Sequence, residues 1–274
     1  MQGPGDALMP PACAGLGDIV DLEKHPLRSD AYRATCRATL DREGAVLLKD
    51  FLLPAAAAFL VDEAERLRPL AYFSEQTHTV YLEESDSTMP ADDARSRAVV
   101  STKGAVTADL IPGSSALNGL YDSPAFRSFI GDVLGEEELH RYADPLSSIN
   151  INYFFEGQEL GWHFDNSSFA VTLLLQQAEA GGVFEYIDGM RSSADDRQNP
   201  VAVAAVLDGR SDRQVVVLGQ RAGGLVLFRG RDALHRVTPV VGSRARILVV
   251  LAYNVEPGLS LSENARRTFF GRLD

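Results

Sequence analysis

The stretch Ser148-Ile149-Asn150-Ile151-Asn152-Tyr153-Phe154 alternates polar and apolar side chains. A period of two is typical of a β-strand that buries one face. Further short strand-like segments follow, separated by glycines; they cover residues 169–176, 183–187, 214–218, 225–228, 235–240 and 246–253. Short strands with glycine turns predict a sandwich or barrel for residues 146–255. The polar, Asp-rich residues 190–213 interrupt the series, and we expect a loop or a short helix there.

The chain before this β-rich region predicts a helical scaffold over residues 19–145. Helix-forming residues fill 29–43, and Pro54 opens a second helical segment that reaches about residue 68. Ser123-Pro124 starts a third, which stops at Gly135. Together with the strands, these segments indicate one catalytic domain over residues 19–274.

Three other segments lack a clear pattern. Residues 74–115 are polar, and only Thr79-Val80-Tyr81-Leu82 looks like a strand, so we expect a lid over an active site or a solvated insertion. Residues 1–18 are rich in Gly, Pro and Ala and predict a flexible tail. Residues 256–274 form a basic and aromatic extension, in which Phe269 and Phe270 either close the site or anchor in the core.

The composition is that of an ordinary soluble globular protein of 274 residues. The net charge of −12 argues against nucleic acid and anionic membranes as partners, because both require basic surface. Cys13 and Cys36 are not spaced as a metal or redox motif and predict free thiols. The sequence contains no apolar run of transmembrane length, and its first residues do not look like a signal peptide, so we expect a cytoplasmic protein. It leaves the oligomeric state open.

His163-Phe164-Asp165, followed 72 positions later by His235, predicts a metal site. On an extended segment, residues two apart point to the same side, so His163 and Asp165 can reach one ion while Phe164 points away. A second strand must supply His235. Two imidazoles and one carboxylate suit iron(II) and leave positions open for a cosubstrate and dioxygen.

The region from Asn150 to Tyr253 resembles the iron(II)/2-oxoglutarate-dependent oxygenases. The matching features are His163-x-Asp165, and His235-Arg236-Val237-Thr238-Pro239-Val240 running into a glycine turn and an arginine-led strand. The resemblance implies a mainly β fold with flanking helices, built on a double-stranded β-helix (jelly-roll, cupin-like) core. It also implies iron(II), 2-oxoglutarate and dioxygen as reactants, with release of succinate and carbon dioxide.

Within that superfamily, residues 161–172 and the ending Phe269-Phe270-Gly271-Arg272 look similar to a group that acts on free amino acids. The group includes radical halogenases of lysine-like substrates and their hydroxylating relatives. Such halogenases carry Gly or Ala in place of the carboxylate, which makes room for chloride. Because Asp165 is present here, the resemblance implies hydroxylation.

The keto acid's distal carboxylate requires a cation, and an arginine fork binds a carboxylate at two points. Arg244 and Arg246 lie on the same strand face. We favour Arg246, because it directly precedes the apolar run of residues 247–251 and should lie deeper.

Several side chains are candidates for contacts with a small polar substrate: Asn150, Asn152, Trp162, Asn166, Arg95, Arg97 and Lys103. If residues 74–115 form a lid, His78 can line the mouth of the site. Other reactions would use the same metal ligands, namely hydroxylation of a peptide or protein, desaturation and cyclisation. A cupin-like binding protein without catalysis would need neither the arginine nor an open metal face.

Overall fold

The computed structural model describes residues 15–192 and 197–274. Its helices are α1 (Leu16–Ile19), α2 (Asp30–Glu43), α3 (Pro54–Leu67), α4 (Ala116–Asp122), α5 (Pro124–Leu134), α6 (Pro200–Leu207) and α7 (Glu263–Phe270), with short 3-10 turns at Arg68–Leu70 and Ala108–Leu110. Its longer strands are β1 (Ala45–Leu48), β2 (Tyr72–His78), β3 (Val99–Val106), β5 (Ile149–Phe154), β6 (Leu160–His163), β7 (Ala170–Gln176), β9 (Phe184–Ile187), β13 (Leu225–Phe228), β14 (Leu234–Val237) and β16 (Arg246–Leu251). Two-residue strands complete the set: β4 (His140–Arg141), β8 (Ala180–Gly181), β10 (Arg191–Ser192), β11 (Arg197–Gln198), β12 (Val216–Val217), β15 (Val240–Val241) and β17 (Tyr253–Asn254).

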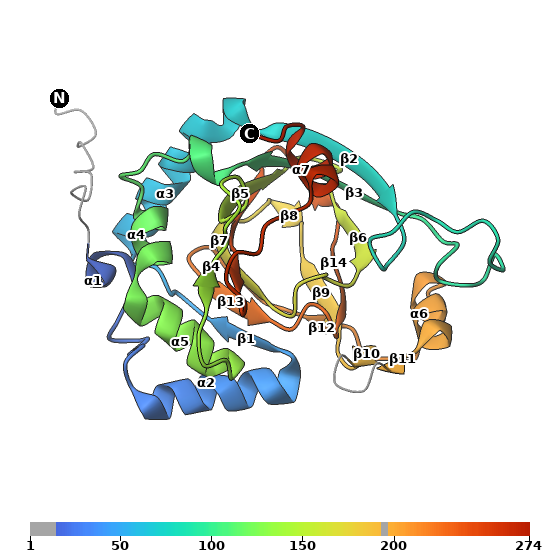
Figure 1. Ribbon diagram of the computed structural model, residues 1–274, viewed down its shortest axis with the longest axis horizontal. Coiled ribbons are helices and arrows are strands. Elements are labelled where there is room, and N and C mark those ends of the chain that lie inside the picture. The colour runs from blue at the N-terminus through green and yellow to red at the C-terminus, as the bar shows by residue number, and fades with distance from the viewer. Residues whose placement is uncertain (1–14, 193–196) are drawn as a thin grey trace.

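One antiparallel sheet of eleven strands dominates the molecule. Its order is β1-β13-β7-β16-β5-β3-β6-β14-β9-β12, and β2 pairs with β3. Neighbours in this order are far apart in sequence, as expected for a jelly roll. Figure 1 shows the sheet curling around the interior of the molecule. The predicted mainly β fold with flanking helices, built on a jelly-roll core, is confirmed.

The helices cover one side of this curled sheet. In Figure 1, α2, α3, α4 and α5 gather on that side, α6 lies across the molecule from them, and α7 lies close to β2. The main hydrophobic core lies between these helices and the outer face of strands β1, β5, β7, β13 and β16. It includes Leu60 and Phe126 of the helices and Ile151 and Leu227 of the strands. Because the core lies on that face, the opposite face is left to line a cavity inside the sheet.

The predicted helices at 29–43, 54–68 and 123–134 are present as α2, α3 and α5, with hydroxyl N-caps on α2 and α5 and proline in the first turn of α3 and α5. The uncertain segment 190–213 contains α6. Within the described residues no helix is both long and apolar enough to span a bilayer. Cys36 is a buried free thiol, whereas Cys13 falls in the part of the chain outside the description.

Three predicted boundaries need correction. Residues 74–115 do not form one lid, because β2 and β3 place residues 72–78 and 99–106 in the main sheet, and only residues 79–98 between them are irregular. For the same reason the sheet is not confined to residues 146–255: β1, β2 and β3 also belong to it. The expected tail 1–18 lies outside the described residues up to position 14, and its last residues enter α1, which leads directly into the buried Ile19 and Val20.

Candidate metal centre

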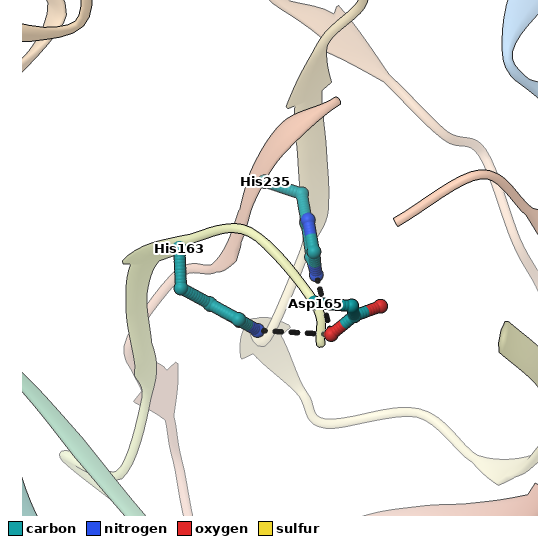
Figure 2. Close-up of side chains that lie close together, drawn as sticks. All are labelled: His163, Asp165 and His235. Atoms are coloured by element: carbon teal, nitrogen blue, oxygen red, sulfur yellow. Dashed lines mark ion pairs between the residues drawn. The ribbon is translucent and has the colours of Figure 1, made fainter. Parts of the chain in front are cut away.

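His163, Asp165 and His235 converge in the interior of the sheet. His163 ends β6 and His235 lies on β14, where the two residues are direct cross-strand partners. Asp165 follows β6 by two residues. Its Oδ1 lies 3.7 Å from Nε2 of His163 and 3.5 Å from Nε2 of His235 (Figure 2). The three ligand atoms lie within 4.8 Å of one another, so one ion can reach all of them.

Backbone carbonyls orient both imidazoles. Nδ1 of His163 lies 2.7 Å from the carbonyl oxygen of Gly161, and Nδ1 of His235 lies 2.9 Å from that of Ala233. A carbonyl only accepts, so each Nδ1 carries the proton and each Nε2 keeps its lone pair for a metal. The same contact between a ring nitrogen and a backbone carbonyl fixes the direction of both imidazoles.

The backbone around Asp165 holds its carboxylate between the two rings. The Asp165 amide donates to the carbonyl of Gly230 at 2.9 Å. A Cβ at Gly230 would lie 1.8 Å from Oδ2 of Asp165, so only glycine fits at this position. Phe164 points the other way, as predicted from the alternation, and is buried against the ring of Tyr81 at a centroid distance of 5.8 Å.

The electrostatics of the three side chains suit a divalent cation. Burial, helped by the neighbouring His235, lowers the pKa of His163 to about 3, so this ring is neutral at neutral pH. Burial works against ionisation of Asp165, but His235, His163 and Lys103 outweigh it and hold the carboxyl pKa at about 2. At neutral pH the site therefore offers a neutral imidazole and a carboxylate without first losing a proton from either.

A cavity of about 190 Å³ extends from the metal ligands into the sheet and ends at Arg246. Arg246 is 3% exposed, and its Nη1 is buried with no hydrogen-bond partner in the described part of the chain. Burial lowers the pKa of its guanidinium to about 10, so it stays charged at neutral pH. Asn152 lines the same cavity with an unpartnered buried Oδ1. Buried polar atoms without partners are uncommon in proteins and indicate that a ligand completes this site.

Arg244, the alternative candidate, lies outside this cavity. Its side chain is exposed and donates to the backbone carbonyls of Gln177 and Ala178 at 3.0 and 3.3 Å. It lies in the turn before β16, whereas Arg246 is the first residue of the strand. The structure therefore places one of the two arginines at the end of the cavity and the other on the surface.

A second cavity, of about 180 Å³, adjoins the other side of the metal ligands. Residues of β2 and β3, among them His78 and Lys103, form its polar side, and His163 and Asp165 border it. The His78 ring lies 6.3 Å from the His163 ring and contacts the Ser101 hydroxyl at 2.8 Å. Burial lowers the pKa of Lys103 to about 8, although Asp165 acts in the opposite direction. His78 thus lines the site, although it does so from a strand.

Three predicted substrate residues lie away from both cavities. The side-chain amide of Asn150 donates to the carbonyls of Leu146 and Ile149, so it satisfies backbone acceptors at the start of β5. Trp162 alternates with His163 and therefore points outward, where the Arg236 guanidinium lies 4.6 Å from its ring. Asn166 is exposed, and its carbonyl accepts from Arg231 at 3.1 Å.

Arg95 and Arg97, two further candidates for substrate contacts, are engaged elsewhere. Both side chains already have acidic partners: Arg95 pairs with Asp93 at 2.7 Å, and Arg97 pairs with Asp208. Neither arginine lines a cavity beside the metal ligands. Of the three cations considered in this region, only Lys103 does so.

The sequence analysis missed several cavity residues. Thr172 on β7 and Gln220 before β13 contribute the polar ones, while Phe184 and Phe228 place their rings 5.6 and 4.9 Å from that of His235. A signal existed for Thr172, which is the one polar residue inside the apolar run of β7. No comparable signal marked Gln220, which lies outside any strand.

In sequence, the chain matches the Halogenase D family over residues 28–268. No curated protein is significantly similar to it.

Solved structures with the same fold include a member of the 2-oxoglutarate-iron(II) oxygenase family. An oxidoreductase of that family from Burkholderia pseudomallei is 17% identical, with a TM-score of 0.50 over 82% of this chain and 91% of the other. The epimerase SnoN, solved with Fe3+, alpha ketoglutarate and nogalamycin RO, is 16% identical, with a TM-score of 0.55 over 85% and 93% of the two chains. A Pseudomonas putida prolyl-4-hydroxylase is 15% identical, with a TM-score of 0.50 over 80% and 96%.

Proposed function

Because the chain belongs to the Halogenase D family, we propose that it is an iron(II)- and 2-oxoglutarate-dependent dioxygenase that hydroxylates an unactivated C–H bond of a small polar molecule. The observation that carries this proposal is the pairing of two features in one cavity. Three convergent metal ligands line it, and so does the buried cation of Arg246, whose Nη1 has no hydrogen-bond partner among the described residues. A keto acid with two carboxylates has the chemistry to bridge them.

The residues of the site have separate roles in this proposal. His163, Asp165 and His235 hold the iron, and Arg246 receives the distal carboxylate of 2-oxoglutarate through its guanidinium. When bound, iron with dioxygen and the keto acid supplies the oxidising chemistry, with release of succinate and carbon dioxide. The apolar walls around the ligands, including Phe184 and Phe228, exclude water and strengthen these electrostatic contacts.

Asp165 favours transfer of oxygen over transfer of chlorine. A halogenase needs a free ligand position for chloride, which the group resembling this chain obtains by having Gly or Ala in place of the carboxylate. Here the Asp165 carboxylate fills that position, 3.5 and 3.7 Å from the two imidazoles, and the absence of a side chain at Gly230 makes room for it. The family name alone would favour halogenation. We propose hydroxylation instead, because the Asp165 carboxylate occupies the position that chloride would need.

A free amino acid or a related metabolite fits the substrate side best. The second cavity has a volume of about 180 Å³, and side chains from β2, β3 and α7 border it, which suits a small molecule better than a folded partner. We also propose that residues 19–274 act as a single catalytic domain and that the enzyme works in the cytoplasm.

The experiment is incubation of the protein with iron(II), ascorbate, 2-oxoglutarate and a metabolite extract that contains chloride, followed by mass spectrometry. The expected product is heavier than its precursor by about 16 Da, the gain for one inserted oxygen atom. A chlorinated product would contradict the role given to Asp165. A product that has lost two hydrogens would indicate desaturation or cyclisation, and succinate formation that depends only on added peptide would indicate a peptide hydroxylase.

A further inference from the structure

Lys103 lies between the two cavities and has no counter-ion of its own. It is on β3, and its side chain lines both the cavity that ends at Arg246 and the second cavity beside the metal ligands. No hydrogen bond or ion pair involves its ammonium group in residues 15–192 and 197–274. The nearby Asp165 acts electrostatically on Lys103 but serves as a metal ligand in the proposed enzyme. Lys103 is only partly buried, but a cavity-lining ammonium group that pairs with no side chain of residues 15–192 and 197–274 suits an anionic ligand.

The remaining walls of the second cavity determine what else this ligand can carry. Ser74, Gln76 and Ser101 add neutral polar groups on the side of β2 and β3. Leu82 and Phe269 add apolar surface, and Leu82 does so from a strained backbone with φ of 61°. Apart from the metal ligand Asp165, no carboxylate lines this cavity within the described residues. The neutral polar groups can accept hydrogen bonds from an α-ammonium group, but a second positive charge at the end of a side chain would meet only the apolar surface of Leu82 and Phe269.

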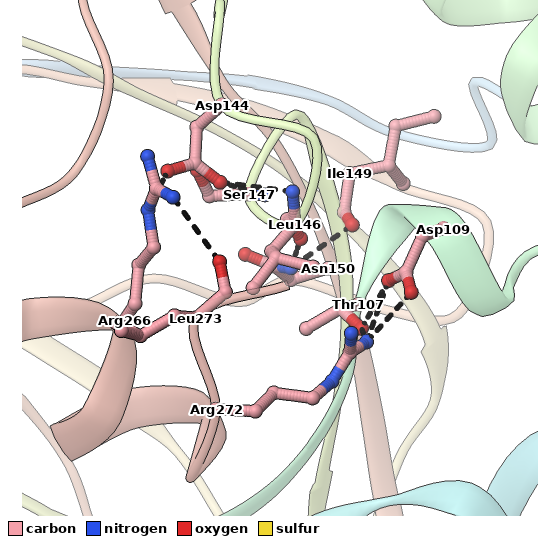
Figure 3. A network of polar contacts seen from close by, with 10 residues as sticks. All are labelled: Thr107, Asp109, Asp144, Leu146, Ser147, Ile149, Asn150, Arg266, Arg272 and Leu273. Carbon is pink, nitrogen blue, oxygen red and sulfur yellow. Dashed lines mark hydrogen bonds and ion pairs between the residues drawn. The ribbon is translucent and has the colours of Figure 1, made fainter. Parts of the chain in front are cut away.

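The wall formed by Phe269 is fixed in place by ion pairs of the C-terminal segment. Nε of Arg266 lies 2.6 Å from Oδ2 of Asp144, a side chain with no solvent exposure. Arg272 donates to both carboxylate oxygens of Asp109 at 2.7 Å (Figure 3). Arg266 lies within α7 and Arg272 follows its end, so the two ion pairs hold α7 on both sides of Phe269. The neighbouring Phe270 is buried. Phe269 is thereby held against the second cavity while its neighbour Phe270 packs in the core.

Resting on the proposed function, we propose that Lys103 binds a carboxylate of the primary substrate, and that the part of the substrate presented to the iron is uncharged. The keto acid is not the partner assigned to Lys103, because Arg246 is available to it at the far end of the first cavity. The carboxylate of a small amino acid would then lie at Lys103, and its side chain would lie against Leu82 and Phe269. Basic amino acids, whose side chain ends in an ammonium group, are poor substrates in this arrangement.

The test compares three probes that differ in one group each. L-norleucine has a carboxylate and an uncharged side chain, L-norleucinamide masks the carboxylate, and L-ornithine replaces the terminal methyl of norleucine by an ammonium group. Binding of each is followed anaerobically by the change it causes in the visible absorption of the protein loaded with iron(II) and 2-oxoglutarate. The variants are Lys103→Met and Lys103→Arg, with Lys49→Met as the control, because Lys49 is exposed.

We expect norleucine to bind at least ten times more tightly to the wild-type protein than norleucinamide or ornithine does. A charge-assisted hydrogen bond contributes enough that Lys103→Met should weaken norleucine binding by roughly 10- to 150-fold. Lys103→Arg should recover most of that loss, and Lys49→Met should change nothing. The affinity for 2-oxoglutarate should be the same in all four proteins.

Three results would overturn the assignment. One is that none of the probes binds the loaded wild-type protein, and another is that ornithine binds as well as norleucine. The third is that Lys103→Met weakens 2-oxoglutarate rather than norleucine, which would give the lysine to the cosubstrate. In each case the absorption band of the loaded protein still forms, so the proposed function stands. Failure of the band itself would count against the proposed function instead.

Discussion

Replacing Arg246 by methionine should stabilise the protein without ligand and abolish tight binding of 2-oxoglutarate. The guanidinium is 3% exposed, and its Nη1 has no hydrogen-bond partner among the described residues. Burial lowers its pKa to about 10, a shift that corresponds to a cost of about 3 kcal/mol for keeping the charge inside. Because the pKa is lower in the folded than in the unfolded chain, this cost is complete below pH 10 and is lost as the pH rises above 10.

The size of each effect follows from these contacts. Methionine keeps the unbranched stem, so the free energy of unfolding of the ligand-free variant should rise by about 1–3 kcal/mol, as when an unpaired buried charge is replaced by an apolar group. Removing one partner of a buried charge pair costs about 2–5 kcal/mol of binding, which weakens 2-oxoglutarate by roughly 30- to 4,000-fold. Stability and affinity should therefore change in opposite directions.

The assays are chemical denaturation of the ligand-free protein and anaerobic calorimetric titration of the iron-loaded protein with 2-oxoglutarate. Arg244→Met is the matched control, since Arg244 is exposed and contacts only nearby backbone and side-chain groups of residues 177–179. It should leave both quantities nearly unchanged. The reasoning is refuted if Arg244→Met loses the keto acid while Arg246→Met keeps it, or if Arg246→Met destabilises the ligand-free fold by several kcal/mol.

Three further predictions concern the metal site and the C-terminal segment. Asp165→Ala should abolish substrate-dependent succinate formation; retained turnover would show that the carboxylate is dispensable. Gly230→Ala should weaken iron binding by about 10- to 100-fold, because the new Cβ would lie 1.8 Å from the Asp165 carboxylate. The control Gly113→Ala, whose Cβ would have no atom within 4 Å, should leave iron binding unchanged. Equal iron affinities of the two variants in a metal titration would contradict this. Asp144→Asn should lower the free energy of unfolding by about 3 kcal/mol, because it removes the fully buried carboxylate that pairs with the largely buried Arg266. Asp122→Asn should cost less than about 1 kcal/mol, because its pair with Arg141 is exposed; denaturation curves that do not separate the two variants would refute the ranking.

The strands of the core could be predicted because their pattern is local. In β5 and β16 most buried positions carry apolar residues, and the two exceptions, Asn152 and Arg246, line the cavity. The strands β2 and β3 escaped prediction because ligand-facing positions break that pattern. Ser101 and Lys103 of β3 point at a cavity, so polar residues stand where a core strand would have apolar ones. Such a polar segment predicts a lid, whereas Ser101 and Lys103 line the cavity from a strand of the main sheet.

The candidate site divides in the same way. His163, Asp165 and His235 could be identified because residue type, spacing and strand parity all agree, and parity also separates the inward His163 from the outward Trp162. The substrate contacts could not be chosen from the sequence, because partners distant in the chain decide which charges are free. Arg97 is neutralised by Asp208, which is 111 residues away, while Lys103 has no such partner among the described residues.

Anaerobic titration of the protein with iron(II) and then 2-oxoglutarate tests whether His163, Asp165, His235 and Arg246 form one iron and keto-acid site. We expect one iron per chain, and a visible charge-transfer absorption that appears only when the keto acid is added. The band should be lost in Asp165→Ala and should require far more keto acid in Arg246→Met. A wild-type protein that binds no iron, or that binds iron without any band on addition of 2-oxoglutarate, would contradict the account.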